Sequence, residues 1–293
     1  MKKLIALLLF LCIFPTPVFG KLQVVATLPW IGSMAGDLGR ERVNVKVFVK
    51  PSQDPHQIEA KPSMILAARN ADILIYNGLD LEIGYLPRII EASANPAIQP
   101  GRSGHLNCSR FVEAIEKQPA LDRSLGDVHP VGNPHYHLSV QNMIKIARGM
   151  TAALTALDSG QAGFYRANLA TFESRVRGWK KKWAGHNLTG KRFVAYHRYF
   201  EYMAMENGFQ IVAYVEEKPG IPPTARHMAK MVEEMKRSKP DGIITTAYQG
   251  KKETDGLSRK TGIRAITIPH DVGSVPSARD WLSLMDAVLS SLQ

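Results

Sequence analysis

The chain has 293 residues, two cysteines and a formal net charge of +11. Its length is sufficient for two lobes that each bury a hydrophobic core. The positive charge does not indicate a nucleic-acid partner, because the basic residues Arg175, Arg177 and 180–182 share one predicted helix with Trp179 and Trp183, which fall on its apolar stripe and are not available for base stacking.

Residues 1–20 have the layout of a secretory signal peptide. Two lysines precede an apolar run at 4–14, and we expect cleavage after Gly20. The run is too short to span a bilayer comfortably, and no later segment approaches about eighteen consecutive apolar residues. We therefore expect a mature chain that begins at Lys21 and is exported and soluble.

The two cysteines bear on anchoring and redox chemistry. Cys12 lies inside the apolar run and does not follow small residues at its end, so a lipid-anchoring cysteine is not expected. After cleavage Cys108 is the one cysteine left, which excludes an intramolecular disulfide. We interpret Cys108 as a buried and inert thiol, with a thiolate metal ligand as the alternative.

In the first half, short apolar runs are separated by helical patterns, which predicts strands and helices in turn. We expect strands at 22–27, 43–49 and 73–76 and helices at 29–39, 62–70, 82–93 and 139–157. Pro87 is expected to bend or break the third of these helices. Residues 94–134 are rich in turn residues and poor in periodicity, and we assign no element there.

A long helix is predicted from Asp158 to Trp183, where apolar residues recur at intervals of three and four. The stripe consists of Ala162, Tyr165, Leu169, Phe172, Val176, Trp179 and Trp183. Asp158 and Ser159 are expected to cap its first turn, and the lysines at 180–182 suit the negative end of its dipole. Its length would be roughly 35–40 Å, so we interpret it as a strut between two lobes.

After this helix the same alternation returns. We expect strands at 192–196, 210–215, 242–246 and 264–268 and helices at 199–207, 224–238, 251–261 and 277–292. One pair of segments indicates an internal duplication. In the first half residues 71–78 read ADILIYNG, and in the second half residues 240–250 read PDGIITTAYQG.

Strands that alternate with helices predict parallel sheets covered by helices. We therefore predict an α/β fold of two lobes, each a mostly parallel sheet flanked by helices, joined by one long rigid helix. The predicted units are a signal peptide at 1–20, an N-terminal lobe at 21–157, the connecting helix at 158–185 and a C-terminal lobe at 186–293. Ligands of such sheets bind beyond the carboxyl ends of the strands, in this case between the lobes.

Four polar residues fall in the loops where such a site is expected, two on each side of the long helix. They are His56, His135, His197 and Asp271. Three imidazoles and a carboxylate form a suitable four-coordinate shell for Zn²⁺, whereas Mn²⁺ prefers more oxygen ligands. Because the four are far apart in the sequence, their spacing alone does not distinguish them from ordinary surface or core residues.

Three motifs resemble those of a known family. They are Asp54-Pro55-His56 before a Pro-opened helix, Gly132-Asn133-Pro134-His135, and Tyr196-His197 followed by Phe200 and Tyr202. With these motifs and the long helix, the whole mature chain resembles the metal-binding proteins of bacterial zinc and manganese ABC importers, the zinc-uptake type in particular. The resemblance implies two α/β lobes on either side of a rigid helix.

The resemblance also implies that His56, His135 and His197 bind the transported metal. A histidine at the third position points to Zn²⁺, because the manganese proteins of the family have a carboxylate there, and a manganese- or iron-binding member is the alternative. When the family's fourth ligand is an aspartate, it follows a late strand and corresponds to Asp271. His270 or a water molecule could take this place instead.

From the resemblance we expect a periplasmic monomer that captures Zn²⁺ and delivers it to an ABC permease and its ATPase at the inner membrane. The alternative from another class is a zinc-dependent hydrolase that uses the same histidines. The chain has no His-Glu-x-x-His helix, no Gly-x-Ser-x-Gly elbow and no phosphate-binding glycine loop, so we do not expect an enzyme. An exported adhesin-like protein that binds metal incidentally is a third alternative.

The chain departs from the family pattern at other histidines. After the second motif the family has Trp-Leu-Asp where this chain has His137-Leu138-Ser139, and we expect His137 to pack in place of the tryptophan, with metal ligation as the alternative. The region before that motif holds only His105 and His129, so the family's His-rich, metal-gathering loop is absent or vestigial. His227 is expected to be a surface residue.

Overall fold

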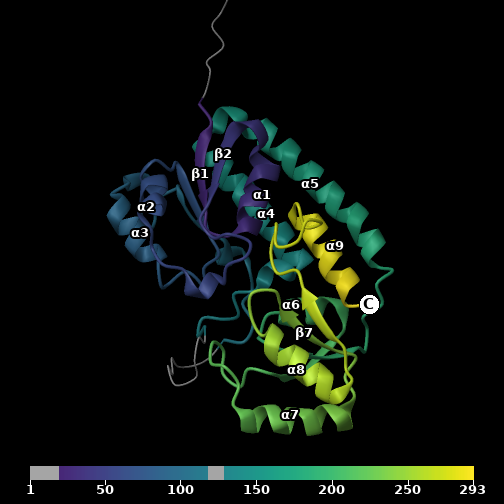
Figure 1. Cartoon of the computed structure of the whole chain (residues 1–293). Helices are drawn as coiled ribbons and strands as arrows, with labels where there is room; N and C mark the ends of the chain where they lie inside the picture. Colours follow the sequence, from purple (N-terminus) through teal and green to yellow (C-terminus); the bar gives the residue numbers. More distant parts are fainter. Residues whose placement is uncertain (1–19, 118–128) are drawn as a thin grey trace, which may run out of the picture.

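The computed structural model describes residues 20–117 and 129–293, which form two parallel sheets flanked by helices (Figure 1). The first sheet has the order β2-β1-β3-β4, with β1 at Leu22–Ala26, β2 at Val43–Val47, β3 at Ile73–Tyr76 and β4 at His105–Asn107. The second has the order β6-β5-β7-β8, with β5 at Arg192–Ala195, β6 at Gln210–Tyr214, β7 at Gly242–Thr246 and β8 at Ala265–Ile268. All neighbouring strands of these sheets are parallel, which confirms the predicted fold class.

The helices agree with the periodicity of the sequence within a few residues at most ends. They are α1 Pro29–Gly39, α2 Pro62–Arg69, α3 Leu86–Ser93, α4 Val140–Leu157, α5 Ala162–Trp183, α6 Glu201–Asn207, α7 Ala225–Ser238, α8 Lys251–Thr261 and α9 Trp281–Ser291. Pro87 lies in the first turn of α3, where a missing N–H removes no helical hydrogen bond. The expectation that it bends a helix starting at residue 82 is therefore wrong, because the helix begins at Leu86.

Two local features differ from the sequence-based expectation. Strand β4 falls in the segment where we assigned no element, because three residues are too short to display an alternation. Asp158 and Ser159 do not cap α5: Asp158 directly follows α4, and its carboxylate accepts a hydrogen bond from the Tyr165 hydroxyl (3.0 Å). A short 3-10 turn at Ser159–Gln161 joins α4 to α5 without a capping side chain.

In both sheets the same pair of hydrogen bonds joins an aspartate to the first strand. The matched segments that suggested a duplication lead into β3 and β7, which both pair with the first strand of their own sheet. The Asp72 carboxylate accepts from the amide of Gln23 (2.7 Å), and the Asp72 amide donates back to the Gln23 carbonyl (2.9 Å). Asp241 makes the same reciprocal pair with Arg192, at 2.7 Å in both directions. The repeated sequence thus fixes the same strand pairing twice.

A continuous hydrophobic core joins the two halves. It runs from the first sheet through α1, α4, α5 and α9 to one face of the second sheet. On β5 the side chains alternate: Phe193 and Ala195 belong to this shared core, while Val194 faces a separate cluster with α7 and α8. Any large separation of the two halves would therefore expose apolar surface.

Helix α5 extends along the molecule from the first half to the second (Figure 1). It packs against α1 and α4 of the first half and against α9 at the end of the chain. The division into lobes at 157/158 and 185/186 stays a prediction, and α9 packs on α1 as well as on β8. The signal-peptide prediction lies outside the described residues apart from Gly20. None of the described helices combines the length and apolar character that crossing a bilayer requires.

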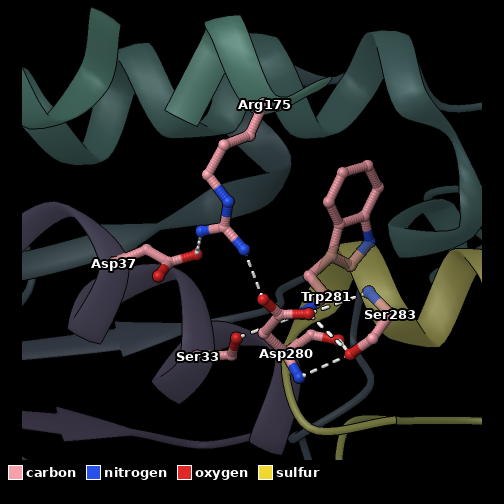
Figure 2. Close-up of polar contacts among 6 residues, drawn as sticks. All are labelled: Ser33, Asp37, Arg175, Asp280, Trp281 and Ser283. Atoms are coloured by element: carbon pink, nitrogen blue, oxygen red, sulfur yellow. Dashed lines mark hydrogen bonds and ion pairs between the residues drawn. The ribbon is translucent and has the colours of Figure 1, made fainter. Parts of the chain in front are cut away.

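Arg175 on the polar face of α5 forms two ion pairs. Figure 2 shows Arg175 between two carboxylates, donating to Asp37 of α1 (3.2 Å) and to Asp280. Asp280 is also the N-cap of α9, where it forms a capping box with Ser283. One guanidinium thereby links the N-terminus of α9 to α1 and α5.

We predict that Phe172→Ala destabilises the protein by about 3–5 kcal/mol, because it leaves a cavity in the shared core. Phe172 is 2% exposed and its ring centroid lies 6.1 Å from that of Trp281 in α9. Chemical denaturation measures the change. The matched control is Thr171→Ala on the exposed face of the same turn, which should change stability by less than about 0.5 kcal/mol. Equal effects of the two substitutions would contradict the described packing of α5.

Candidate metal centre

Three of the four residues singled out in the sequence come together in the structure. His56, His135 and His197 each have a ring nitrogen within 4.8 Å of the nitrogens of the other two. Their ring centroids are 5.3, 5.6 and 5.4 Å apart. One histidine follows β2, one precedes α4 and one follows β5, so the cluster joins loops from both halves of the chain.

His56 is oriented by the residue two positions before it. It lies in a 3-10 turn at Pro55–Gln57, and the Asp54 carboxylate accepts hydrogen bonds from both its amide (3.0 Å) and its Nδ1 (2.8 Å). Burial raises the pKa of Asp54, but these hydrogen bonds outweigh it and hold the pKa below its usual value. An ionised Asp54 places the proton of the neutral imidazole on Nδ1 and leaves Nε2 with a free lone pair.

His197 has a partner of the same kind on the neighbouring strand. Its Nδ1 lies 2.7 Å from a carboxylate oxygen of Glu216, and both side chains are buried. Glu216 follows β6, and its amide donates to the carbonyl of Tyr196 at the end of β5 (3.0 Å). The parallel pairing of β5 with β6 therefore brings the carboxylate to the histidine and leaves Nε2 of His197 available to a metal.

The loop that carries His135 is fastened to the second half of the chain. Asn133 accepts a hydrogen bond from the His135 amide (2.9 Å), and its side-chain amide donates to the Arg198 carbonyl (3.1 Å). The ring of Tyr199 packs against that of His135 at 4.2 Å between centroids. Burial, with smaller contributions from His56 and His197, lowers the pKa of His135 well below its ordinary value, so this imidazole is neutral at physiological pH.

Two nitrogens of the cluster are buried without a partner. Nε2 of His56 and Nε2 of His135 make no hydrogen bond within the described residues. A buried polar atom left unpaired costs about 1–3 kcal/mol, so native structures rarely leave one without a reason. Two such atoms that converge with a third imidazole form a site for a cation that accepts nitrogen lone pairs.

Asp271 lies beside this cluster but is not part of it. The group of mutually close ligand atoms does not include it, and its carboxylate accepts from the amide of Val272 (2.7 Å). It lines a narrow cavity together with His135, His137 and His270. Burial, opposed by backbone hydrogen bonds, raises the pKa of Asp271 to about 8.

The other histidines near the second motif have structural contacts. His137 is stacked on Trp30 at 6.0 Å, and its Nε2 lies 2.9 Å from the His270 carbonyl, in agreement with the expected packing role. His270 is buried with its ring against Tyr248, and neither of its nitrogens has a partner in the described part of the chain. It is also outside the group of three. Cys108 is buried, and burial raises the pKa of its thiol, as expected of an inert cysteine.

Two residues near the site, Glu216 and His129, were not predicted from the sequence. Glu216 follows a predicted strand, as His56 and His197 do. A search for polar residues after the ends of strands could therefore have identified it. His129 was assigned to a vestigial loop, yet its ring lies 5.3 Å from that of His56. No periodicity or motif marked it. His105, the other histidine of that region, is instead bonded to the Tyr76 hydroxyl (2.9 Å) and lies 2.8 Å from the Ile98 carbonyl.

Comparison with known proteins gives this geometry a context. The chain matches the model of the family described as zinc-uptake complex component A, periplasmic (ZnuA), over residues 24–293. The chain belongs to this family. It is therefore a metal-binding, substrate-binding protein of an ABC importer and not an enzyme.

Individual relatives of this ZnuA-family chain are distant. The iron ABC transporter substrate-binding lipoprotein MtsA of Streptococcus pyogenes serotype M1 is 23% identical over 247 residues, which cover 83% of this chain and 77% of MtsA. The zinc-binding lipoprotein AdcA of Streptococcus pneumoniae serotype 4 is 22% identical over 266 residues, 90% of this chain and 53% of AdcA. A crystal structure of ZnuA superposes with a TM-score of 0.76 at 21% identity, covering 93% of this chain and 98% of that one, which shows the shared fold.

We predict that Glu216→Ala lowers metal affinity by about 10–100-fold, because it frees the ring of His197 to rotate and removes the acceptor that fixes its proton on Nδ1. Competition with a chelator of known affinity measures the change. Glu217→Ala is the matched control, since the Glu217 side chain is 53% exposed and its ion-pair partner is His227, outside the cluster. Unchanged affinity in Glu216→Ala would show that this carboxylate does not orient His197.

Proposed function

We propose that the protein captures Zn²⁺ with His56, His135 and His197 and delivers it to an ABC permease. The observation that carries this proposal is the convergence of three imidazole nitrogens, two of them buried and unpaired. A divalent cation held there would satisfy these nitrogens. Binding by capture requires no substrate pocket and no general base, which fits a transport protein.

The donor set favours zinc over manganese and iron. Imidazole is a good zinc ligand, whereas Mn²⁺ is better served by carboxylate, carbonyl and water oxygens. Among the residues that the structure describes, no carboxylate belongs to the cluster, and Asp54 and Glu216 are both engaged with the outer nitrogens of the histidines. Because MtsA is named for iron and AdcA for zinc, the relatives do not identify the metal of this chain. We therefore assign the metal from the ligands.

The prediction that Asp271 is the fourth ligand stays a prediction. Its carboxyl lies at the same cavity, and a divalent cation nearby would favour its ionised form over the neutral form that burial favours. Its hydrogen bond from the Val272 amide supplies one partner without a metal. We therefore rest the proposed site on the three histidines.

Release of the ion requires movement of loops more than of whole halves. The shared core runs through α1, α4, α5 and α9, and separating the halves would expose it to water. Tyr136 and Tyr199, close in sequence to His135 and His197, belong to this core, whereas the 3-10 turn Pro55–Gln57 that carries His56 has no buried residue. We propose that contact with the permease displaces the turn that carries His56 and reduces the number of nitrogen ligands.

The cellular setting follows from the same proposal. We propose that the chain is exported, is cleaved after Gly20, works as a monomer in the periplasm and meets a permease and its ATPase at the inner membrane. Its relatives MtsA and AdcA are named lipoproteins. The position of Cys12 inside the apolar run supports release of this chain without a lipid anchor.

We predict that metal-free protein binds one Zn²⁺ and that binding raises its melting temperature more than Mn²⁺ does, because the ion binds only the folded state. His56→Ala, His135→Ala and His197→Ala should each remove most of this thermal shift. His227→Ala on α7, whose Nε2 faces the Tyr214 carbonyl, is the control and should retain it. Equal or greater stabilisation by Mn²⁺ would contradict the zinc assignment.

We predict that zinc affinity is constant above about pH 7 and falls as the pH drops below about 6.5, because an imidazole must lose its proton before it binds the ion. His135 should contribute little to this fall, since burial lowers its pKa and keeps it neutral further into the acid range. Chelator competition at several pH values measures the dependence. Affinity that stays flat down to about pH 5 would mean that the histidines are not the ligands.

A further inference from the structure

The three-histidine cluster leaves a tetrahedral zinc ion one ligand short. Structural and transport sites that retain zinc are generally four-coordinate, with nitrogen ligands at about 2.0–2.1 Å. The carboxylate predicted for the fourth position, Asp271, is outside the cluster and already accepts a hydrogen bond from Val272. A further donor near the three imidazoles is therefore of interest.

His129 is such a donor. Its ring centroid lies 5.3 Å from that of His56, the same separation as between His56 and His135. Its Nε2 is buried and has no hydrogen-bond partner among the described residues 20–117 and 129–293. The described part of the chain thus contains a fourth imidazole at the cluster with a nitrogen in the same unpaired state as those of His56 and His135.

The backbone carbonyl of Leu79 lies near the other side of the His129 ring. Burial lowers the pKa of His129 to about 3, and this carbonyl opposes the shift. Metal-binding histidines commonly donate one ring N–H to a carboxylate or backbone carbonyl, which fixes the tautomer and frees the other nitrogen. Asp54 and Glu216 do this for His56 and His197, and the Leu79 carbonyl is positioned near the His129 ring to do the same.

The backbone holds His129 beside the second motif. The His129 carbonyl accepts a hydrogen bond from the amide of Gly132 (3.0 Å), which closes a turn just before Asn133. Gly132 has a φ of 127°, and a Cβ there would lie 2.5 Å from the Cβ of Ala114. Only glycine fits this turn, and the turn connects His129 to the loop that carries His135.

We infer that His129 supplies the fourth ligand, so that the ion is held by four imidazoles. This inference rests on the proposed function and assigns a residue to the fourth coordination position of the proposed zinc site. In the structure His129 is next to His56 but is not within 4.8 Å of all three histidines. Binding therefore requires a rotation of its ring toward His135 and His197, which closes the shell over the ion.

Residue 129 can be tested for direct contact with the metal by changing its ligand chemistry. His129→Cys loaded with Co²⁺ should show a thiolate-to-cobalt charge-transfer band in the near ultraviolet. The parent protein, whose Cys108 is buried elsewhere, and a His227→Cys control should not show it. A His129→Cys protein that binds Co²⁺ without this band would overturn the inference.

Affinity and ligand counting provide the second arm. X-ray absorption of the zinc-loaded parent should fit four imidazoles, and His129→Ala should fit three with one oxygen and lose at least about tenfold in zinc affinity. Asp271→Asn should retain both the four imidazoles and the affinity. Parent affinity in His129→Ala, or an oxygen ligand in the parent that is lost in Asp271→Asn, would overturn the inference while leaving the proposed function intact. A parent that binds no zinc would overturn both.

Discussion

The site depends on keeping several imidazoles neutral and close together. Two protonated rings at the separations seen between His56, His135 and His197 would repel each other in a buried setting, where charge is poorly screened. In the neutral rings of His56 and His197 the carboxylates of Asp54 and Glu216 accept the Nδ1 protons, which leaves the Nε2 lone pairs free. A cation is the natural partner for lone pairs arranged in this way. The surrounding loops place the three rings so that this arrangement forms.

Two sheets of equivalent construction, with one shared core, hold the loops in place. Asp72 and Asp241 pair with the first strand of their sheets through the same two hydrogen bonds, so both halves present strand ends in the same way. Helix α5 and helix α9 then connect the halves through apolar packing and through Arg175. The core extends to the neighbours of two ligands, since Tyr136 and Tyr199 belong to it, whereas the turn Pro55–Gln57 that carries His56 has no buried residue. The packing that stabilises the fold therefore also positions His135 and His197, and the His56 turn is the part of the site that is left to move.

The sequence predicted the fold well and the site in part. Strict alternation and intervals of three and four located most strands and helices, including α5, whose stripe from Tyr165 to Trp183 is the side that packs inward. Three histidines were predicted because each follows or precedes an element and resembles a family motif. The partners of these histidines were not, since Glu216 reaches His197 only through strand pairing. His129 carries no periodic or motif signal at all, and only the folded chain brings it to His56.

The most direct test of this account is a crystal structure of the zinc-loaded protein with an anomalous difference map at the zinc absorption edge. We expect a single strong peak about 2.0–2.1 Å from Nε2 of His56, His135 and His197, with Asp54 and Glu216 still bonded to the outer nitrogens. A peak elsewhere in the molecule, or one bound chiefly by carboxylate oxygens, would contradict it.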